Sequence, residues 1–323
     1  MSDASKVTEG GFGGEPGPGT VLLTGGAGFI GSHVRRLLRS RGTPVRVLAH
    51  RADVDAADTV RGDLADPASL RGICAGVTTL VHAASVINGS EEECRAVNEH
   101  GTAALVDEAR RAGVRRIVYV STAAVYGEGV HRGITEDAVD PAPVGPTSSS
   151  RLAAEKLVRA AGGTVLRPMF VYGAGDRWFI PQVASLAGYL TASLADGGSR
   201  LSLISVDDLA EAVGAVAQLP PGEVDGEVLH VTHPEPTPLA EILEVLAENS
   251  LTAALPGDAH ERTVAAMGAS APRRLRLLTS DHYYDSARLW RSVDVSCGPG
   301  FRTAFPRYAQ WYKDAIAAAD KAS

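Results

Sequence analysis

Three glycines near the start of the chain have the spacing of a phosphate-binding turn. Gly25, Gly28 and Gly31 follow the apolar run 20–24 and open an amphipathic segment at 29–40. In such a turn Gly25 permits the tight bend, Gly28 lets the backbone approach a diphosphate, and Gly31 lets the helix lie close to the strand. The free N–H groups and the positive dipole end of the helix then face the phosphates. The spacing predicts a dinucleotide site.

The glycine turn opens a series in which short apolar runs alternate with segments of helical period. The apolar runs lie at 20–24, 44–48, 79–83, 116–121 and 164–167, and the helical segments at 29–40, 91–112 and 149–161. This alternation is typical of βαβ units. The predicted fold class is α/β, a Rossmann-type doubly wound parallel sheet with a smaller C-terminal substrate lobe. Further helices are expected near 179–190, 207–218, 239–248 and 303–319.

The predicted domain organisation has three parts. Residues 1–18 are Gly- and Pro-rich and are expected to form a disordered N-terminal tail. The dinucleotide-binding Rossmann domain covers 19–170, with 201–235 returning to it, and the substrate-binding lobe covers 171–200 and 236–323. The Pro- and Ser-rich stretch within 133–150 is interpreted as an active-site loop, because the alternation resumes directly after it.

Composition excludes several classes of protein. The 323 residues carry 31 Lys and Arg against 38 Asp and Glu, a formal charge of −7, with no basic stripe for nucleic acid. The sequence has no run of about 18 apolar residues, so no membrane-spanning helix is predicted. The three cysteines, Cys74, Cys94 and Cys297, are widely spaced, which fits a reduced cytoplasmic protein without a metal site. A small-molecule substrate is the expected partner.

Several short motifs share one family pattern. They are the glycine turn, 62–64 (Gly-Asp-Leu), 81–84 (Val-His-Ala-Ala), 97–102 (Val-Asn-Glu-His-Gly-Thr), 121–127 (Ser-Thr-Ala-Ala-Val-Tyr-Gly), 166–168 (Leu-Arg-Pro), 171–173 (Val-Tyr-Gly) and 205–210 (Ser-Val-Asp-Asp-Leu-Ala). In combination they resemble the extended short-chain dehydrogenase/reductase family, the NAD(P)-dependent epimerase/dehydratase group. The resemblance runs from about residue 21 to residue 311.

The resemblance implies a set of cofactor-binding positions. They are Gly25, Gly28, Phe29, Ile30, Gly31, His50, Arg51, Asp63, Leu64, Ala83, Ala84, Ser121, Arg151 and Pro168. NAD-preferring members carry an acidic side chain at the end of the second strand, where this chain has Ala49. His50 and Arg51 follow, and a cation there suits a 2′-phosphate. NADP is therefore the expected cofactor, with NAD as the alternative.

The family's catalytic residues are only partly present. The family uses a Ser or Thr together with a Tyr and a Lys four residues apart, the Tyr as acid or base and the Lys lowering its pKa. Thr122 matches the first position, but Thr147 and Arg151 stand where the Tyr and Lys belong. None of the eight tyrosines is followed by a lysine four residues later. Arg151 can still clamp ribose hydroxyls, whereas Thr147 can hold a substrate oxygen but cannot ionise.

Proton transfer must then use another group. The candidates are Tyr126, Glu128, His131, Glu136, Asp137 and ordered water. Tyr126 is the preferred candidate among these because it lies beside the strand-five segment, although a packing role is favoured over a catalytic one. Asn98 either reaches the active-site helix or caps its own. The group 177–179 (Arg-Trp-Phe) is expected to line a pocket.

Three functions are compatible with these residues. The first is an NAD(P)-dependent oxidoreductase, epimerase or dehydratase that acts on a secondary alcohol or ketone of a nucleotide sugar or specialised metabolite. The second is a non-redox lyase, isomerase or cyclase on the same scaffold, and the third is a non-catalytic NADP-binding sensor. The resemblance also implies a homodimer formed through the helices at 91–112 and 149–161.

Overall fold

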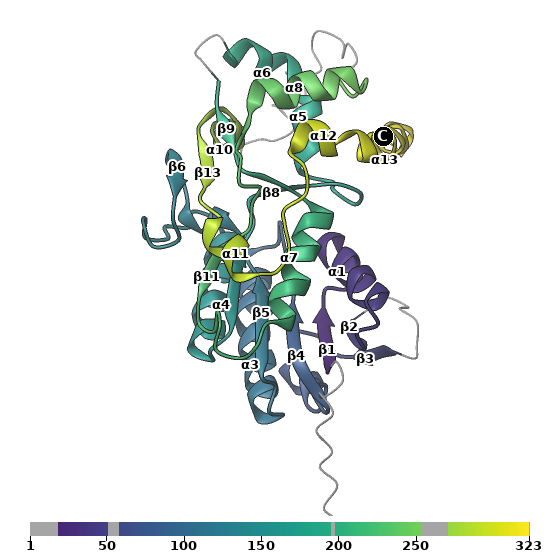
Figure 1. Ribbon diagram of the computed structural model, residues 1–323, viewed down its shortest axis with the longest axis vertical. Helices are drawn as coiled ribbons and strands as arrows, with labels where there is room; N and C mark the ends of the chain where they lie inside the picture. The colour runs from purple at the N-terminus through teal and green to yellow at the C-terminus, as the bar shows by residue number, and fades with distance from the viewer. Residues whose placement is uncertain (1–18, 51–57, 195–197, 253–270, 323) are drawn as a thin grey trace, which may run out of the picture.

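The computed structural model describes residues 19–50, 58–194, 198–252 and 271–322. In Figure 1 a helix-covered sheet fills the lower part of the molecule and a smaller, mainly helical lobe lies above it. The tail predicted at 1–18 lies outside the described residues.

A seven-stranded sheet forms the main body, in the order β11-β7-β5-β4-β1-β2-β3. Its strands are β1 (Thr20–Thr24), β2 (Val45–Ala49), β3 (Thr59–Arg61), β4 (Val77–His82), β5 (Arg116–Val120), β7 (Thr164–Arg167) and β11 (Val228–His230). Every pairing between them is parallel. The predicted Rossmann-type fold class is confirmed. The chain order reverses between β1 and β4, the place where such sheets bind ligands at their carboxyl ends.

Helices cover both faces of the sheet (Figure 1). On one face lie α1 (Phe29–Ser40) and α7 (Val206–Gln218); on the other lie α2 (Glu91–Cys94), a π-helical stretch η3 (Arg95–Gly101), α3 (Thr102–Arg111) and α4 (Pro146–Ala160). Two short 3-10 turns, η2 (Pro67–Leu70) and η4 (Ala123–Tyr126), complete this body. Each face has its own core of Val and Leu side chains, because parallel strands are buried on both sides.

The smaller lobe combines short strands with helices. Its strands are β6 (His131–Ile134), β8 (Phe170–Tyr172), β9 (Arg200–Leu201), β10 (Leu203–Ser205), β12 (Thr237–Pro238) and β13 (His282–Tyr284). Its helices are α5 (Phe179–Ser185), α6 (Ala187–Ser193), α8 (Leu239–Glu248), α10 (Ala271–Thr279), α12 (Phe301–Ala304) and α13 (Pro306–Ala322). The helix α11 (Ala287–Ser292) packs against the sheet body. Stacked and edge-on aromatic rings, from Phe170 to Tyr312, fill much of its core.

Three elements, β6, β10 and α11, cross the predicted boundary between the two bodies. β10 falls within the segment 201–235 predicted for the Rossmann domain, but it pairs with β8 of the lobe. β6 was placed within the Rossmann segment, but it pairs with β13 in the lobe's four-stranded sheet. α11 was placed in the lobe, but Leu289 packs into the core between the sheet and α7. The helix expected at 303–319 is also interrupted: α12 ends at Ala304 and α13 begins at Pro306, a residue favoured in the first turn of a helix.

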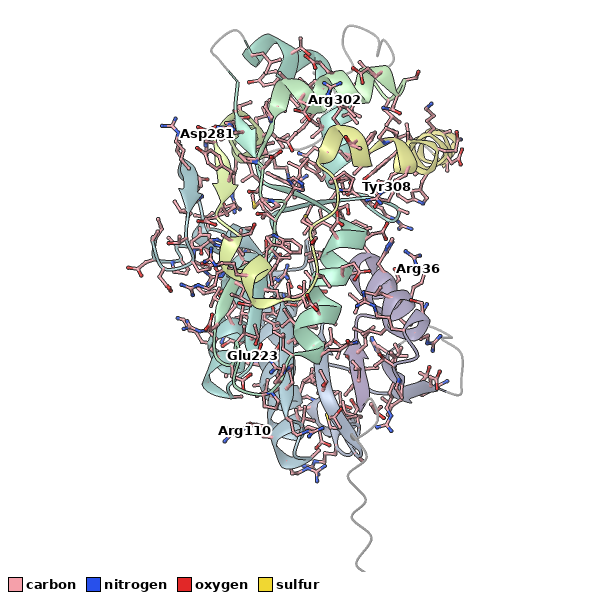
Figure 2. The ribbon with its side chains drawn as sticks, viewed as in Figure 1. Arg36, Arg110, Glu223, Asp281, Arg302 and Tyr308 are labelled. Atoms are coloured by element: carbon pink, nitrogen blue, oxygen red, sulfur yellow. The ribbon has the colours of Figure 1, made fainter. Side chains whose placement is uncertain are left out.

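Asp207 joins the sheet body to the lobe. Its carboxylate lies 2.8 Å from Nδ1 of His33 on α1 and accepts a hydrogen bond from the Tyr308 hydroxyl on α13 at 2.7 Å. The Arg36 guanidinium approaches the same carboxylate at 3.4 Å. Figure 2 places Arg36 and Tyr308 on the same side of the molecule, where α1 meets the lobe. Hydrogen bonding from His33 lowers the pKa of Asp207 to about 2.

The described residues contain neither a candidate membrane-spanning helix nor a candidate metal-binding group. Within them, no helix has the length and apolar character that crossing a membrane requires. The same part of the chain holds no group of three or more His, Cys, Asp or Glu side chains arranged to bind a metal ion.

Candidate cofactor and catalytic site

The glycine turn connects β1 to α1 at the point where the strand order reverses. Gly25 has a φ of +71°, and a Cβ placed on it would lie 2.7 Å from the carbonyl carbon of Ala83. A Cβ on Gly31 would overlap the Gly25 carbonyl oxygen, so glycine lets α1 pack directly on the turn. Gly28 donates its N–H to the Gly25 oxygen at 2.8 Å. The backbone therefore forms a closed, side-chain-free cradle.

A cavity of about 800 Å³ opens over this cradle. Of the predicted cofactor residues, Gly25, Gly28, His50, Asp63, Leu64 and Ala84 line it. Phe29 and Ile30 lie in the first turn of α1, which no described side chain caps and which holds no acidic residue. The uncapped first-turn N–H groups and the helix dipole thus favour an anion beside the glycine turn that lines the cavity. The residues present fit the diphosphate of a dinucleotide, and the volume falls within the usual range for ligand sites.

The far end of the cavity bears on the choice between NAD and NADP. Ala49 ends β2 without a carboxylate, and the next residue, His50, places Nε2 2.9 Å from Oδ2 of Asp63. The other carboxylate oxygen of Asp63 accepts the Ala65 N–H at 2.9 Å, which fixes its position. Arg51, the second cation predicted here, lies outside the described residues. The arrangement places an imidazole beside a carboxylate at this end of the cavity.

The cavity also has a wall that the sequence motifs did not indicate. Residues 85–89, which follow β4, and Glu93 on α2 line it. Asn98 fixes this wall: its Oδ1 accepts the Val86 N–H at 2.8 Å, and its Nδ2 donates to Ser150 Oγ on α4 at 3.0 Å. Of the two roles considered for Asn98, the reach to the active-site helix is the one observed. Asn98 lies in the π-helical stretch η3, a distortion common at functional sites.

The carboxyl end of β5 carries the candidate substrate-binding hydroxyl. Thr122 is half-buried, and its Oγ1 accepts the Ala124 N–H at 3.2 Å, which leaves the hydroxyl hydrogen free to donate. Ser121 is committed elsewhere, because its Oγ donates to Glu155 at 2.5 Å. Pro168 is held at the same edge of the sheet, since its carbonyl accepts the Ala123 N–H at 2.8 Å.

Thr147 and Arg151 lie on successive turns of α4, but their side chains are turned into the protein. Thr147 Oγ1 lies 3.7 Å from the Cys94 sulfur. Arg151 Nη2 donates to the Val120 carbonyl at 2.6 Å, and its buried Nε finds no hydrogen-bond partner in the described part of the chain. The Arg151 guanidinium thus places a positive charge against the last residue of β5.

His82, at the end of β4, bridges three elements from a buried position. Its ring nitrogens lie 2.6 Å from Thr24 Oγ1 on β1 and 2.9 Å from Thr102 Oγ1 on α3. Burial, followed by the charge of Arg151, lowers the pKa of His82 to about 3. The imidazole is therefore neutral and holds the strand ends and α3 together.

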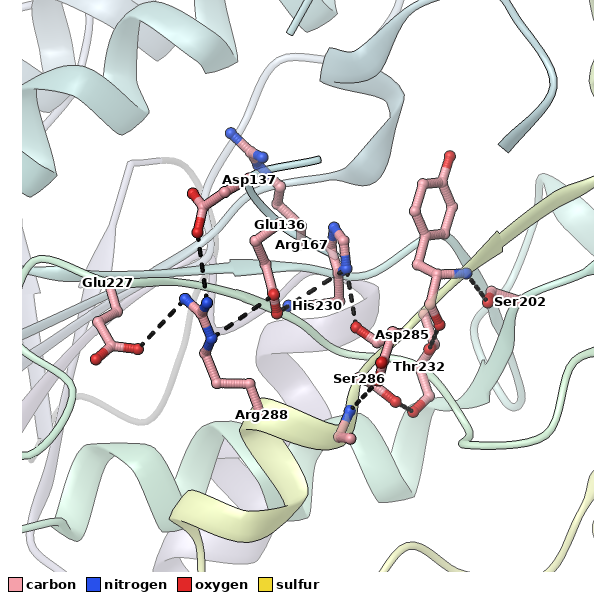
Figure 3. Close-up of polar contacts among 12 residues, drawn as sticks. Glu136, Asp137, Arg167, Ser202, Glu227, His230, Thr232, Asp285, Ser286 and Arg288 are labelled. Carbon is pink, nitrogen blue, oxygen red and sulfur yellow. Dashed lines mark hydrogen bonds and ion pairs between the residues drawn. The ribbon is translucent and has the colours of Figure 1, made fainter. Parts of the chain in front are cut away.

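Tyr126, the preferred catalytic candidate, lies in a buried polar network. Its hydroxyl accepts a hydrogen bond from Arg167 at 2.8 Å and lies 2.7 Å from Nε2 of His230 and 3.0 Å from the Glu136 carbonyl oxygen. Figure 3 shows the surroundings of His230, where the Glu136 carboxylate has contacts with His230 and with Arg288. Burial raises the pKa of Tyr126 to about 12, which opposes proton release near neutral pH.

The other proton-transfer candidates also have partners. Glu128 accepts from Arg276 at 3.2 Å, and Asp137 accepts from Arg288 at 3.4 Å. His131 is buried, and its Nδ1 lies 3.1 Å from the Tyr284 hydroxyl. Burial lowers the pKa of His131, which disfavours its charged form.

The three side chains at 177–179, which were expected to line a pocket, point in different directions. Arg177 and Trp178 are exposed, whereas the Phe179 ring stacks on Phe170 in the lobe core, with 4.6 Å between ring centres.

A buried ion pair beneath the site was not assigned a role from the sequence. Arg167 donates to both oxygens of Glu155, at 3.0 and 2.5 Å, and both side chains are almost fully buried. Through Ser121 and Tyr126, the pair connects α4 to β5, β7 and the turn η4. The sequence carries one signal for this pair. Arg167 is a charged residue in an otherwise apolar strand, and Glu155 lies on the buried face of the neighbouring helix.

Comparison with known proteins adds a family and a set of relatives. The model of the NAD dependent epimerase/dehydratase family matches residues 21–231. The chain is 31% identical to the 4-hydroxy-2-methyl-3-oxo-4-farnesyl-3,4-dihydroquinoline-1-oxide ketoreductase of Stigmatella aurantiaca, over 71% of this chain and 72% of that protein. It is 29% identical to the 2-alkyl-3-oxoalkanoate reductase of Stenotrophomonas maltophilia, over 70% and 74% respectively.

Solved structures show the same fold. A short-chain dehydrogenase/reductase superfamily protein from Agrobacterium tumefaciens with bound NAD superposes with a TM-score of 0.71 at 21% identity, covering 94% of this chain and 99% of that one. The UDP-glucose 4-epimerase of Thermus thermophilus in complex with NAD superposes with a TM-score of 0.69 at 23% identity, covering 91% and 99%.

Proposed function

Because this chain belongs to the NAD-dependent epimerase/dehydratase family and is an oxidoreductase-type member of it, we propose that it interconverts a ketone and a secondary alcohol with NADP. The proposed substrate is a specialised metabolite rather than a nucleotide sugar. Two relatives that match more than two thirds of the chain are named as a ketoreductase and a 3-oxoalkanoate reductase, which supports this choice. The observation that carries the proposal is the side-chain-free cradle beneath a cavity of about 800 Å³ at the switch point of the sheet.

The proposed cofactor site uses the residues of the cavity. The first turn of α1 and the glycine cradle would hold the diphosphate, and Leu64 and Ala84 would flank the adenosine. The absence of a carboxylate at Ala49 and the position of His50 support NADP, because an imidazole N–H can donate a hydrogen bond to a 2′-phosphate. When bound, the cofactor supplies or accepts a hydride, so that in reduction the carbonyl carbon gains a hydride and its oxygen gains a proton.

The chain's own residues would position the substrate oxygen. Thr122 donates its free hydroxyl hydrogen to that oxygen. Arg151, held on the Val120 carbonyl, places a positive charge near the end of β5 and favours negative charge on the oxygen in the transition state. Thr147 cannot ionise, and Tyr126 is committed to Arg167 and His230, so we propose that the proton comes from water.

The proposal is tested by mixing the purified protein with NADPH and a panel of ketones. NADPH binding is followed by its fluorescence and turnover by the loss of its absorbance. The expected result is NADPH binding together with ketone-dependent oxidation. Failure of NADPH and NADH to bind would overturn the proposal. Turnover that continues without cofactor would instead indicate the non-redox alternative.

One observation favours a second candidate, an NADP-binding sensor. Both catalytic positions on α4 are altered, and their side chains contact Cys94 and the Val120 carbonyl. Such a protein would retain the phosphate cradle without a proton-transfer pair. Tight NADPH binding with no oxidation by any ketone of the panel would favour this second candidate.

We also propose a cytoplasmic homodimer that pairs α3 and α4 with their copies in a second chain. α3 and α4 pack side by side on one face of the sheet, where a four-helix contact can form. Light scattering in solution should give twice the mass of the chain, and a monomeric mass would contradict the proposal.

A further inference from the structure

A second cavity, of about 280 Å³, lies between the segment that follows β5, the helix α10 and the strand β13. Its inner wall is apolar and includes Ala124, Met169, Leu277 and Tyr284. At about 30 Å³ for each water-sized group, the volume corresponds to about nine such groups. This space suits a short apolar chain and is too small for a nucleoside diphosphate.

The inner end of this cavity lies beside the candidate catalytic hydroxyl. Ala124, which lines the cavity, donates its N–H to Thr122 Oγ1 at 3.2 Å. Met169, another lining residue, directly follows Pro168, whose carbonyl accepts the Ala123 N–H at 2.8 Å. Thr122 itself is not among the described residues that line the cavity, but its hydroxyl is joined to the lining by the Ala124 N–H.

The outer end of the cavity carries an excess of positive charge. Arg273 and Arg276, one turn apart on α10, both line it and both approach Glu128, at 3.9 Å and 3.2 Å. One carboxylate thus faces two guanidinium groups. His282 also lines the cavity, and burial lowers its pKa, so it adds no charge near neutral pH.

Because Arg273, Arg276 and Glu128 are partly exposed, an anionic ligand group can replace Glu128 as the partner of the two arginines. The side chains of Arg273, Arg276 and Glu128 are 43%, 59% and 48% exposed, so their ion pairs are weak and easily replaced. A guanidinium binds a carboxylate through two parallel hydrogen bonds, and two guanidinium groups one turn apart can share a single carboxylate. Glu128 therefore occupies the place that an anionic ligand group would take.

We infer that the substrate is an oxo acid whose carboxylate binds Arg273 and Arg276 in place of Glu128, with its short apolar chain in the 280 Å³ cavity and its keto group at Thr122. This inference rests on the proposed ketone reduction and assigns its substrate class.

The test compares two ketones that differ at the carboxyl group alone, 7-oxooctanoate and its methyl ester, with NADPH as the reductant; in both, the keto group and the carboxyl group lie at opposite ends of a short apolar chain. We expect the KM for the acid to be about tenfold lower than that for the ester, the lower end of the range for a hydrogen-bonded charge. Arg273→Gln and Arg276→Gln should each raise the KM for the acid several-fold and leave the KM for the ester unchanged. Glu128→Gln should lower the KM for the acid, because the competing carboxylate is gone.

Arg274→Gln is the matched control. Arg274 lies on the same helix but is not among the described residues that line the cavity, so its loss should change neither KM. Equal KM values for acid and ester, or equal effects of the Arg273 and Arg276 variants on both, would overturn the inference and leave the proposed ketone reduction standing.

A binding measurement separates the two proposals if neither compound is reduced. Calorimetric titration of the NADP-loaded protein with octanoate should then show binding that the Arg273→Gln/Arg276→Gln variant loses. Binding of this kind would keep the carboxylate site while the proposed reductase activity fails. Absence of octanoate binding would refute the site.

Discussion

Among the ion pairs in the described part of the molecule, the buried pair of Glu155 and Arg167 should destabilise the fold most when one partner is replaced. The two side chains are 2% and 4% exposed, and Arg167 also donates to the Tyr126 hydroxyl at 2.8 Å. Replacing Arg167 by Met leaves the Glu155 carboxylate buried without its cation. Removing one partner of such a pair costs about 3–5 kcal/mol. We expect Arg167→Met to lower the free energy of unfolding by that amount.

The second half of this test removes both charges. In the variant Glu155→Met/Arg167→Met the buried pair leaves no uncompensated charge, and the main loss is the partner of the Ser121 hydroxyl, worth about 1–3 kcal/mol. The Tyr126 hydroxyl keeps its contacts with His230 and the Glu136 carbonyl. Some of this loss is offset by apolar packing, so the double variant should be more stable than Arg167→Met alone. Together with the single variant Glu155→Met, these variants complete a double-mutant cycle that measures the coupling within the pair.

The assay is urea unfolding followed by circular dichroism, with Arg132→Met as the exposed control. Arg132 pairs with Asp281 at 2.7 Å, but its side chain is 67% exposed and the pair is screened by solvent, so its loss should cost far less than the loss of Arg167. The reasoning is refuted if Arg167→Met costs no more than the control, or if the double variant is the less stable of the two.

Three further predictions address the cofactor site and the lobe junction. Gly25→Ala should reduce NADPH affinity at least tenfold in a fluorescence titration, because the new Cβ would lie 2.7 Å from the Ala83 carbonyl carbon at a φ of +71°. His50→Ala should weaken NADPH binding more than NADH binding in the same titration; equal effects would contradict the NADP preference. The pKa of Asp207 is lowered to about 2, so its contribution is full above its ordinary pKa near 4 and is lost as the pH falls toward 2. Because this carboxylate is 42% exposed, screening reduces the effect to about 1 kcal/mol, and urea midpoints of Asp207→Asn and the parent should differ at pH 7 and converge near pH 2.

Much of the sheet body could be predicted because its signals are local. The strands 20–24 and 164–167 and the helix 29–40 have the observed bounds, since apolar runs and helical periodicity persist along each whole element. The short strand β3 has neither a long apolar run nor a flanking helical pattern, and it was not predicted. The strands of the lobe, of two to four residues, are too short to carry a periodic signal.

The candidate site likewise has parts that the sequence predicts and parts that it does not. The glycine turn was predictable because each glycine answers a backbone requirement within seven residues of chain. Thr122 was identified by its motif, and its catalytic role stays a prediction. The partners of Tyr126 were not predictable, since His230 lies 104 positions away and its contact depends on how β11 and the lobe pack.

By itself, the sequence determined the α/β class, the phosphate cradle and the loss of the family's Tyr and Lys, because these depend on residue type, backbone geometry and short-range spacing. Only the tertiary structure decided where the replacement side chains point. It turned Arg151 onto the Val120 carbonyl, and it placed Arg273 and Arg276 beside Glu128 at the mouth of a second cavity. The physical reason is that a charged side chain takes its position from partners brought together by long-range packing, which no local pattern records.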